Sequence, residues 1–178
     1  MPHLQPRVAK LKSSHTNLND FMVAMNPDVQ MSYGKDAKRA ILCDSPELVV
    51  INQAYGENAA EAWMIPQITD LAKFAGAKDK LDERQYKQLA CIIAAEFGYL
   101  KATELMLFFY RFKCGWYGKF YGAVDPLDIV TALRTNFINE RAAIIDQHNR
   151  EQNAKEVEEH RKHAITFDEY MRRKQQQS

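Results

Sequence analysis

The 178-residue sequence lacks the patterns that mark secreted, membrane-spanning or disulfide-bonded proteins. Its three cysteines, Cys43, Cys91 and Cys114, are far apart and odd in number, so they form neither a disulfide framework nor a zinc-binding pattern. The first residues contain no hydrophobic signal region, and no apolar run approaches the roughly 20 residues that a transmembrane helix needs. We therefore expect a cytoplasmic protein without a membrane contact.

The sequence also lacks a charge excess and the common catalytic motifs. Its formal net charge is only +1, which gives no general attraction to nucleic acids or membranes. It has no phosphate-binding glycine loop, no Gly-x-Ser-x-Gly motif and no cysteine with a histidine close by. The best candidate for an acid–base catalyst, Glu96 beside Phe97, is more simply the partner of a lysine or arginine. We expect no enzymatic activity and no cofactor.

One pair of histidines has the spacing of metal ligands. His160 and His163 are three residues apart in a charged segment, with Glu156 and Glu159 nearby. Such a pair can contribute to a metal site, but no third or fourth ligand is placed beside it by the sequence. We interpret the segment as a solvated helix and expect no metal.

What the sequence does contain is a strongly apolar stretch in its second half. Seven of the eight residues from 105 to 112 have large apolar or aromatic side chains, and the eighth is Arg111. At 3.6 residues per turn these side chains cover nearly the whole circumference of a helix, which is typical of a buried helix. A strand is the competing interpretation of a short apolar run, but β-branched residues are nearly absent. The sequence predicts a buried helix over residues 102–113.

A loop rich in aromatics and glycines follows this helix. Gly115 lies where a helix commonly ends in a left-handed residue, and residues 116–122 read WYGKFYG. Asp125 and Pro126 then form a helix start, with a capping side chain and a proline at the first helical position. The segment therefore predicts a corner between two helices.

Apolar residues recur at helical spacing on both sides of this corner, and no segment alternates as a strand would. Ser45 and Pro46 resemble the start of a first helix. A second helix over residues 58–74 contains Pro66, so it should kink there or begin near residue 64. Asp82 and Gln85 form a capping pair at the start of a third helix. We predict an all-α protein, a single compact helical domain of about five helices. An extended N-terminal arm precedes it, and a long charged C-terminal helix follows it.

These elements suggest three segments. Residues 1–44 show no sustained period and should form a flexible or extended arm, with one short helix near residues 19–25. Residues 45–146 should form the helical core, and residues 147–178 a charged helical extension and tail.

Several residues together resemble a known but uncharacterised group of proteins. They are Gln85, Leu89, Ala90, Ile93, Glu96, Leu100, Lys101, Glu104, Leu105, Phe108, Phe109, Lys113, Gly115, Tyr117, Gly118, Tyr121, Gly122, Asp125, Ile129, Leu133 and Arg141. The pattern resembles a family of small helical proteins carried by phages and mobile elements of gut-type bacteria, over about residues 45–145. The resemblance implies a helical fold and hints at a role in DNA replication or transfer, but implies no catalytic residues.

The aromatic loop allows two interpretations. Residues 99–122 carry four Lys or Arg against one Glu, so aromatics could stack on unpaired bases while cations meet phosphates, in single- or double-stranded nucleic acid. Alternatively, the rings pack beneath the helix and the loop is a structural corner. The candidate nucleic-acid-binding residues are Arg111, Lys113, Trp116, Tyr117, Lys119 and Tyr121. Because residues 111 and 113 point about 200° apart on a helix, a single basic patch needs the loop to curl back.

The C-terminus offers a second candidate site. Thr166 caps a short final helix whose apolar side chains, Phe167, Tyr170 and Met171, could anchor in a groove of a protein partner or fold back onto their own domain. We therefore predict a non-enzymatic helical adaptor of a phage or mobile element that binds nucleic acid and, through its termini, a protein. The alternative is a protein–protein interaction or assembly module without nucleic-acid contact.

Overall fold

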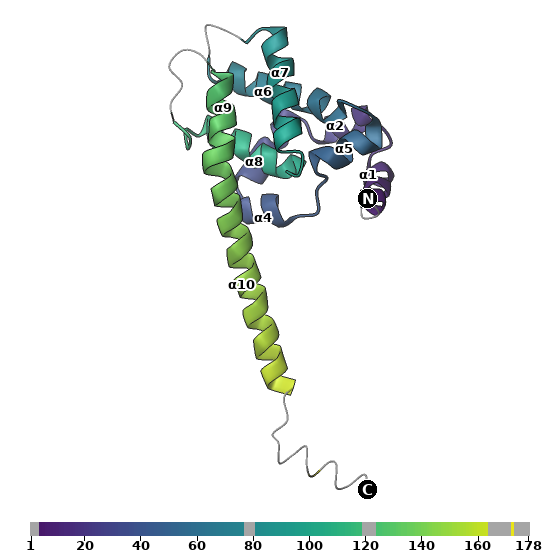
Figure 1. Cartoon of the computed structure of the whole chain (residues 1–178), viewed down its shortest axis with the longest axis vertical. Coiled ribbons are helices and arrows are strands. Elements are labelled where there is room, and N and C mark those ends of the chain that lie inside the picture. The colour runs from purple at the N-terminus through teal and green to yellow at the C-terminus, as the bar shows by residue number, and fades with distance from the viewer. Residues whose placement is uncertain (1–3, 77–80, 119–123, 164–171, 173–178) are drawn as a thin grey trace. The chain divides into compact units, whose positions relative to one another are not determined.

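A computed structural model describes residues 4–76, 81–118, 124–163 and 172 of the chain, and in these residues the fold is all-α (Figure 1). An isolated bridge between Glu47 and Lys101 is the extent of β-structure there. In chain order the helices are α1 (Leu4–Ser14), α2 (Leu18–Ala24), the 3-10 turn η1 (Pro27–Val29), α3 (Gln30–Gly34), α4 (Ala37–Leu42), α5 (Leu48–Tyr55), α6 (Ala59–Phe74), α7 (Glu83–Glu96), α8 (Ala102–Lys113), α9 (Pro126–Ala132), the π-helical turn η2 (Leu133–Phe137) and α10 (Ile138–His163).

Helix α8 is the centre of the fold, as the sequence predicted. Ten of its twelve residues are buried, and α3, α4 and α6 pack against it. Leu105, Met106, Leu107, Phe108 and Phe109 have no exposed surface. A helix covered on all sides by its neighbours contributes to stability mainly through burial of its apolar surface.

Helices α3 and α8 approach each other closely at Gly34. A Cβ built on Gly34 would lie 2.1 Å from the ring of Tyr110, so only a glycine fits at this crossing. The side-chain amide of Gln30 in α3 donates a hydrogen bond of 2.6 Å to Gln67 in α6, and both residues are buried. The short helix α3 is therefore fixed on two neighbouring helices.

The N-terminal segment differs from the expected flexible or extended arm. Residues 4–42 form four short α-helices, and α3 and α4 pack on α8. Phe21 is 1% exposed and lies against Trp63, whose indole N–H donates to the carbonyl of Met25 at 2.8 Å. The short helix expected near residues 19–25 is confirmed as α2. The segment belongs to the core because each of these helices buries at least one side chain, namely Leu11, Phe21, Gln30 and Ile41.

The predicted helix ends are mostly confirmed. Asp82 and Gln85 form a capping box at α7, and Asp125 caps α9 with Pro126 at its first position. Helix α6 begins at Ala59 and contains Pro66, so the later start near residue 64 was wrong. The prediction that Ser45 begins a helix was also wrong. Residues 46 and 48 instead exchange backbone hydrogen bonds with Ala102 and Leu100, and α5 begins at Leu48.

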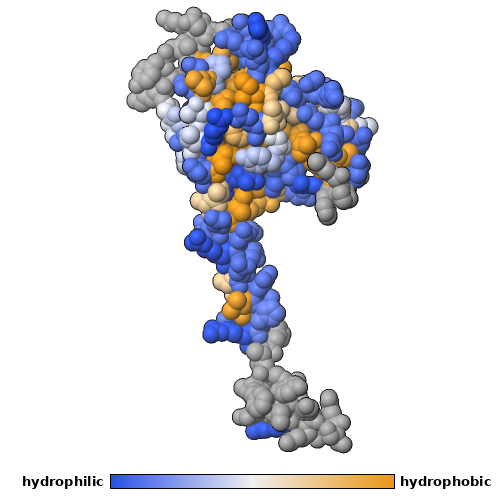
Figure 2. Space-filling view, viewed as in Figure 1, coloured by the Kyte–Doolittle hydropathy of each residue, from blue (hydrophilic) through white to orange (hydrophobic). Residues whose placement is uncertain are grey.

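Contacts divide the chain into two compact units, residues 1–141 and residues 142–178. The boundary lies close to the predicted start of the extension at residue 147. Within the second unit, α10 is charged and mostly exposed, and Figure 2 shows mainly hydrophilic side chains along it. Val157 is an exposed large apolar residue in this part of α10. No helix in the described part of the chain has the length and apolar character to cross a membrane.

Candidate functional site

The two described cations of the predicted nucleic-acid site, Arg111 and Lys113, pair with carboxylates of the fold. Arg111, in the last turn of α8, forms an ion pair with Glu140 in the first turn of α10. Its side chain is 10% exposed, and its guanidinium carbon lies 4.5 Å from the centre of the Trp116 ring. Trp116 itself is 62% exposed and lies on the solvent side of this contact.

Lys113, on another side of α8, also lies beside one carboxylate and one aromatic ring. Its ammonium group pairs with Asp70 of α6 and lies 5.8 Å from the centre of the Phe74 ring. The Lys113 side chain is 16% exposed, whereas Phe74 is 64% exposed. The cation is again covered, and the aromatic ring is on the outside.

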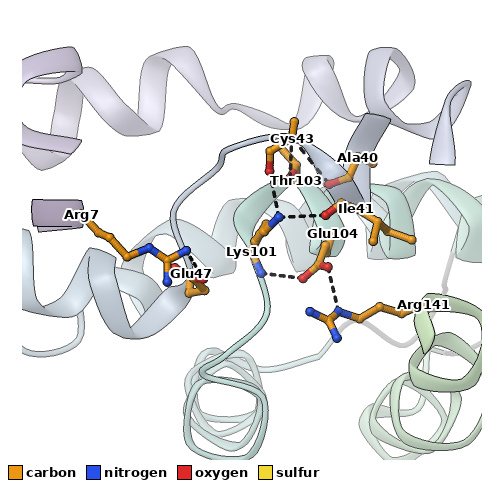
Figure 3. A network of polar contacts seen from close by, with 9 residues as sticks. All are labelled: Arg7, Ala40, Ile41, Cys43, Glu47, Lys101, Thr103, Glu104 and Arg141. Carbon is orange, nitrogen blue, oxygen red and sulfur yellow. Dashed lines mark hydrogen bonds and ion pairs between the residues drawn. The ribbon is translucent and has the colours of Figure 1, made fainter. Parts of the chain in front are cut away.

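A third arrangement of this kind was not proposed as a site from the sequence. Arg141 donates from Nε to Glu104 Oε1 at 2.7 Å, and its guanidinium carbon lies 5.7 Å from the centre of the Tyr99 ring. Glu104 is fully buried and Tyr99 is 49% exposed (Figure 3 shows the Glu104–Arg141 contact). The resemblance included Glu104 and Arg141, but nothing in the sequence linked them to Tyr99.

The remaining described cation of this region, Lys101, is also used inside the fold. Its ammonium group donates to the carbonyl oxygens of Ile41 and Cys43, each at 2.8 Å, at the C-terminal end of α4 (Figure 3). The backbone N–H of Lys101 donates to Glu104 Oε2 at 2.8 Å, which satisfies a free donor at the start of α8. Lys101 therefore joins α4 to α8.

We call the three arrangements the cation–aromatic sandwiches: Arg111 between Glu140 and Trp116, Lys113 between Asp70 and Phe74, and Arg141 between Glu104 and Tyr99. In each, a carboxylate pairs with the cation, and an aromatic residue more exposed than either lies against the cation. A cation beneath a ring attracts the ring's electron-rich face. The effect is to hold three exposed aromatic side chains in defined positions.

Two sandwiches lie along one seam between α8 and the start of α10. Glu104 and Arg111 are seven residues apart, which places them on the same face of α8, and the neighbouring residues Glu140 and Arg141 reach them from α10. The two ion pairs have opposite orientations. Helix α8 contributes the acid to one pair and the base to the other, and so does α10. This reciprocal pairing fixes the first turn of α10 against α8 and places Trp116 and Tyr99 at the seam.

Trp116 is also fixed through its backbone. The N–H of Trp116 donates to the carbonyl of Arg111 at 3.1 Å, and the N–H of Gly115 to that of Phe112 at 3.0 Å. Gly115 has φ of 77°, the left-handed conformation that this helix-ending motif requires. The predicted glycine at the end of α8 is confirmed, and it sets the direction in which Trp116 leaves the helix.

Tyr117 forms the inner side of the corner. Its ring stacks on Phe108 at 5.3 Å between centres, and its hydroxyl lies 3.3 Å from Glu140 Oε2. Burial, and next the charge of Glu140, raises the pKa of the Tyr117 hydroxyl well above its ordinary value of 10.0. Tyr117 therefore has the packing role that the structural-corner interpretation gave to the loop.

Other predicted site residues fall outside this description. Lys119 and Tyr121, like Phe167, Tyr170 and Met171, lie outside the residues that the structure describes. Arg111, Lys113, Trp116 and Tyr117 are described, and the two cations do not form one exposed face. His160 and His163 both lie on α10, and no group of three or more metal-ligating side chains occurs among the described residues.

A family profile matches the second half of the chain. It describes DUF6633, a family of unknown function, and covers residues 80–178. The chain belongs to the DUF6633 family. No curated protein and no solved structure matches it.

The DUF6633 segment contains the whole α8–α10 seam. Both seam sandwiches, with Tyr99, Glu104, Arg111, Trp116 and Arg141, lie inside residues 80–178. Asp70 and Phe74, which complete the third sandwich, lie before it. The match begins later than residue 45, where we expected the resemblance to begin, and extends beyond residue 145.

Proposed function

We propose that this DUF6633 protein is a non-enzymatic protein–protein interaction module that contacts its partner through Trp116 and Tyr99 at the α8–α10 seam. The observation that carries the proposal is the Arg111 sandwich. A tryptophan that is 62% exposed lies on a guanidinium that is itself held by Glu140. Tryptophan, tyrosine and arginine are the residue types most enriched in the energetic centres of protein interfaces.

Rigidity supports the same proposal. The backbone of Trp116 is held by the helix-ending motif at Gly115, and its ring by Arg111. A side chain already fixed in one position loses less conformational entropy when a partner binds it. The partner we expect is a protein surface with an apolar pocket for the indole ring.

The charge arrangement makes this proposal preferable to nucleic-acid binding. Nucleic-acid affinity comes largely from cations that neutralise phosphates. Lys101, Arg111, Lys113 and Arg141 each have an acceptor within the fold. A phosphate would have to compete with Glu140, Asp70 or Glu104 for these cations. A phage or mobile-element origin, and binding of a protein by the C-terminal residues, remain predictions of the sequence.

The test compares the proteins that the wild-type chain and two variants of it capture in cells of the native host. Wild-type protein, a Trp116→Ala/Tyr99→Ala variant and a Val23→Ala control are tagged and isolated from nuclease-treated lysate. Val23 is 64% exposed on α2, away from the seam, and serves as the matched loss of an exposed apolar side chain. We expect a specific protein that wild type and control retain and that the seam variant loses at least tenfold, given about 2 kcal/mol or more for an interface anchor.

Equal melting temperatures would show that the double variant keeps its fold. Equal capture of the same proteins by all three forms would contradict the proposal. A protein that wild type captures from untreated lysate but not from nuclease-treated lysate would instead favour the nucleic-acid adaptor.

A further inference from the structure

A small pocket lies between the aromatic corner and the π-helical turn. Its volume is about 190 Å³, and it is lined by Phe112, Tyr117, Gly118, Asp128, Thr131, Ala132 and Asn136. The aromatic side chains come from the end of α8 and the corner, and the polar ones from α9 and η2. We call this the corner pocket.

The π-helical turn explains why the polar residues meet there. Thr131 and Asn136 are five residues apart, which would place them about 140° apart around a regular α-helix at 100° per residue. In η2 the N–H of Ile138 bonds to the carbonyl of Leu133, five residues before it, so each turn holds one more residue. The extra residue brings Asn136 above Thr131, and both line the same pocket. π-helical turns of this kind occur frequently at functional sites.

The side chain of Asn136 is also oriented before any ligand binds. The hydroxyl of Thr135 lies 2.7 Å from the Asn136 side-chain oxygen and 2.8 Å from the carbonyl of Thr131. The wall of α9 and η2 therefore offers a carboxylate, a hydroxyl and an amide. Opposite them are the rings of Phe112 and Tyr117.

The charge of the lining selects the class of ligand. Asp128 is exposed at the rim and is the charged residue among those that line the pocket, so a phosphate or carboxylate would be repelled there. A planar cation fits both walls, because it can pair with a carboxylate and lie against an aromatic ring. A guanidinium also has enough donors for a carboxylate, a hydroxyl and an amide together.

We propose that the corner pocket binds an arginine side chain of a protein partner, through Asp128, Asn136 and the rings of Tyr117 and Phe112. This inference rests on the proposed function, since it adds a charged contact to the same protein interface. Trp116 directly precedes Tyr117, so a partner on Trp116 passes close to the pocket.

The test uses two probes and no partner protein. N-acetyl-arginine-N-methylamide and its neutral analogue N-acetyl-citrulline-N-methylamide are titrated into the full chain while backbone amide signals are followed by NMR. We expect saturable shifts at Gly118, Thr131 and Asn136 with the arginine probe, at a Kd of roughly 1–10 mM. Asp128→Asn should weaken this binding about tenfold, as expected for a charge-assisted hydrogen bond. Asp146→Asn, which neutralises an exposed acid on α10, should leave it unchanged.

A second variant keeps the test decisive if Asp128→Asn disturbs α9. Asn136→Leu places an apolar side chain in the pocket, and it should abolish the shifts while the melting temperature stays within a few degrees of wild type. Equal shifts with citrulline, no shifts at the pocket, or tighter binding of inorganic phosphate than of the arginine probe would overturn the proposal. Because the probes require no partner, a failure here leaves the capture experiment with Trp116 and Tyr99 standing on its own.

Discussion

Two sets of ion pairs hold helices to the core of this protein, and they differ in how much water surrounds them. Helix α1 is joined to the segment before α5 by Arg7 with Glu47 and Lys10 with Asp44, and the two cations are 46% and 65% exposed. Around α8, the side chains of Arg111, Lys113 and Arg141 are 10%, 16% and 25% exposed. The cations of the ion pairs are therefore exposed to water at α1 and largely covered by the fold around α8.

The difference determines what each set can do. Exposed ion pairs contribute little to stability, because water and salt screen them and long side chains must be ordered. Buried pairs rarely stabilise a fold relative to apolar packing, but loss of one partner is costly because a charge is left buried. The pairs around α8 therefore fix geometry, and the geometry they fix is the position of Trp116, Phe74 and Tyr99. The pairs of α1 attach a helix whose apolar contribution to the core is Leu11.

The largest effect should follow the loss of the buried acid of the seam. Glu104→Gln keeps the shape of the side chain but leaves Arg141 without its partner, and it weakens the bond to the backbone N–H of Lys101. We expect a loss of about 3–5 kcal/mol in the free energy of unfolding, measured by urea denaturation. Asp44→Asn, the matched change at α1, should cost less than about 1 kcal/mol. Similar losses for both variants would show that the two sets of pairs do not differ.

An intermediate effect is expected where α3 meets α8. Gly34→Ala places a methyl group 2.1 Å from the ring of Tyr110, so either α3 or the Tyr110 ring must shift. The expected cost is about 1–3 kcal/mol, as for other overpacked cores. Ser32→Ala, an exposed change in the same helix, should have little effect. If Gly34→Ala is as stable as wild type, α3 is not seated on α8 as described.

The smallest effect concerns the exposed pair of α1 and depends on pH. The hydrogen bond and charge of Lys10 lower the pKa of the Asp44 carboxyl below its ordinary value of 3.8. Because the folded-state pKa is the lower one, any stabilisation is present above the ordinary value and is lost as the pH falls through the folded value. Lys10→Ala should return the pKa of Asp44, followed by carboxyl NMR, to near its ordinary value. A pKa that stays low in this variant would assign the shift to another group.

Long periodic helices and most of their ends could be predicted from the sequence, whereas α2 was the one α-helix predicted among the described residues of the N-terminal segment. Helices α3 and α4 contain five and six residues, too few to show an apolar period. The local signal that was available lies in the capping residues of this segment, because Asn17, Asn26 and Asp36 accept a backbone hydrogen bond at the starts of α2, η1 and α4. Burial of Phe21 in α2 and of Ile41 in α4 depends on tertiary packing, which local spacing does not reveal.

The candidate site was predicted in part. The sequence identified Arg111, Lys113, Trp116 and Tyr117 as neighbours in one region, and the expected conflict in direction between residues 111 and 113 agrees with their separate partners. It could not show which carboxylates those cations meet, because Asp70 and Glu140 are far from them in the chain. The role of Tyr99 was missed for the same reason, since Arg141 lies 42 positions later in the sequence.

Binding of oligonucleotides over a range of salt concentrations tests most directly whether the cations of α8 are held within the fold. The affinities of wild type and Lys113→Gln for single- and double-stranded DNA would be measured by fluorescence anisotropy from low to physiological salt. We predict only weak binding at physiological salt, with a Kd no tighter than about 10⁻⁶ M, and the same salt dependence for both forms. Tighter binding by wild type, with a salt slope that falls by about one in Lys113→Gln, would show that Lys113 meets a phosphate and would contradict the account.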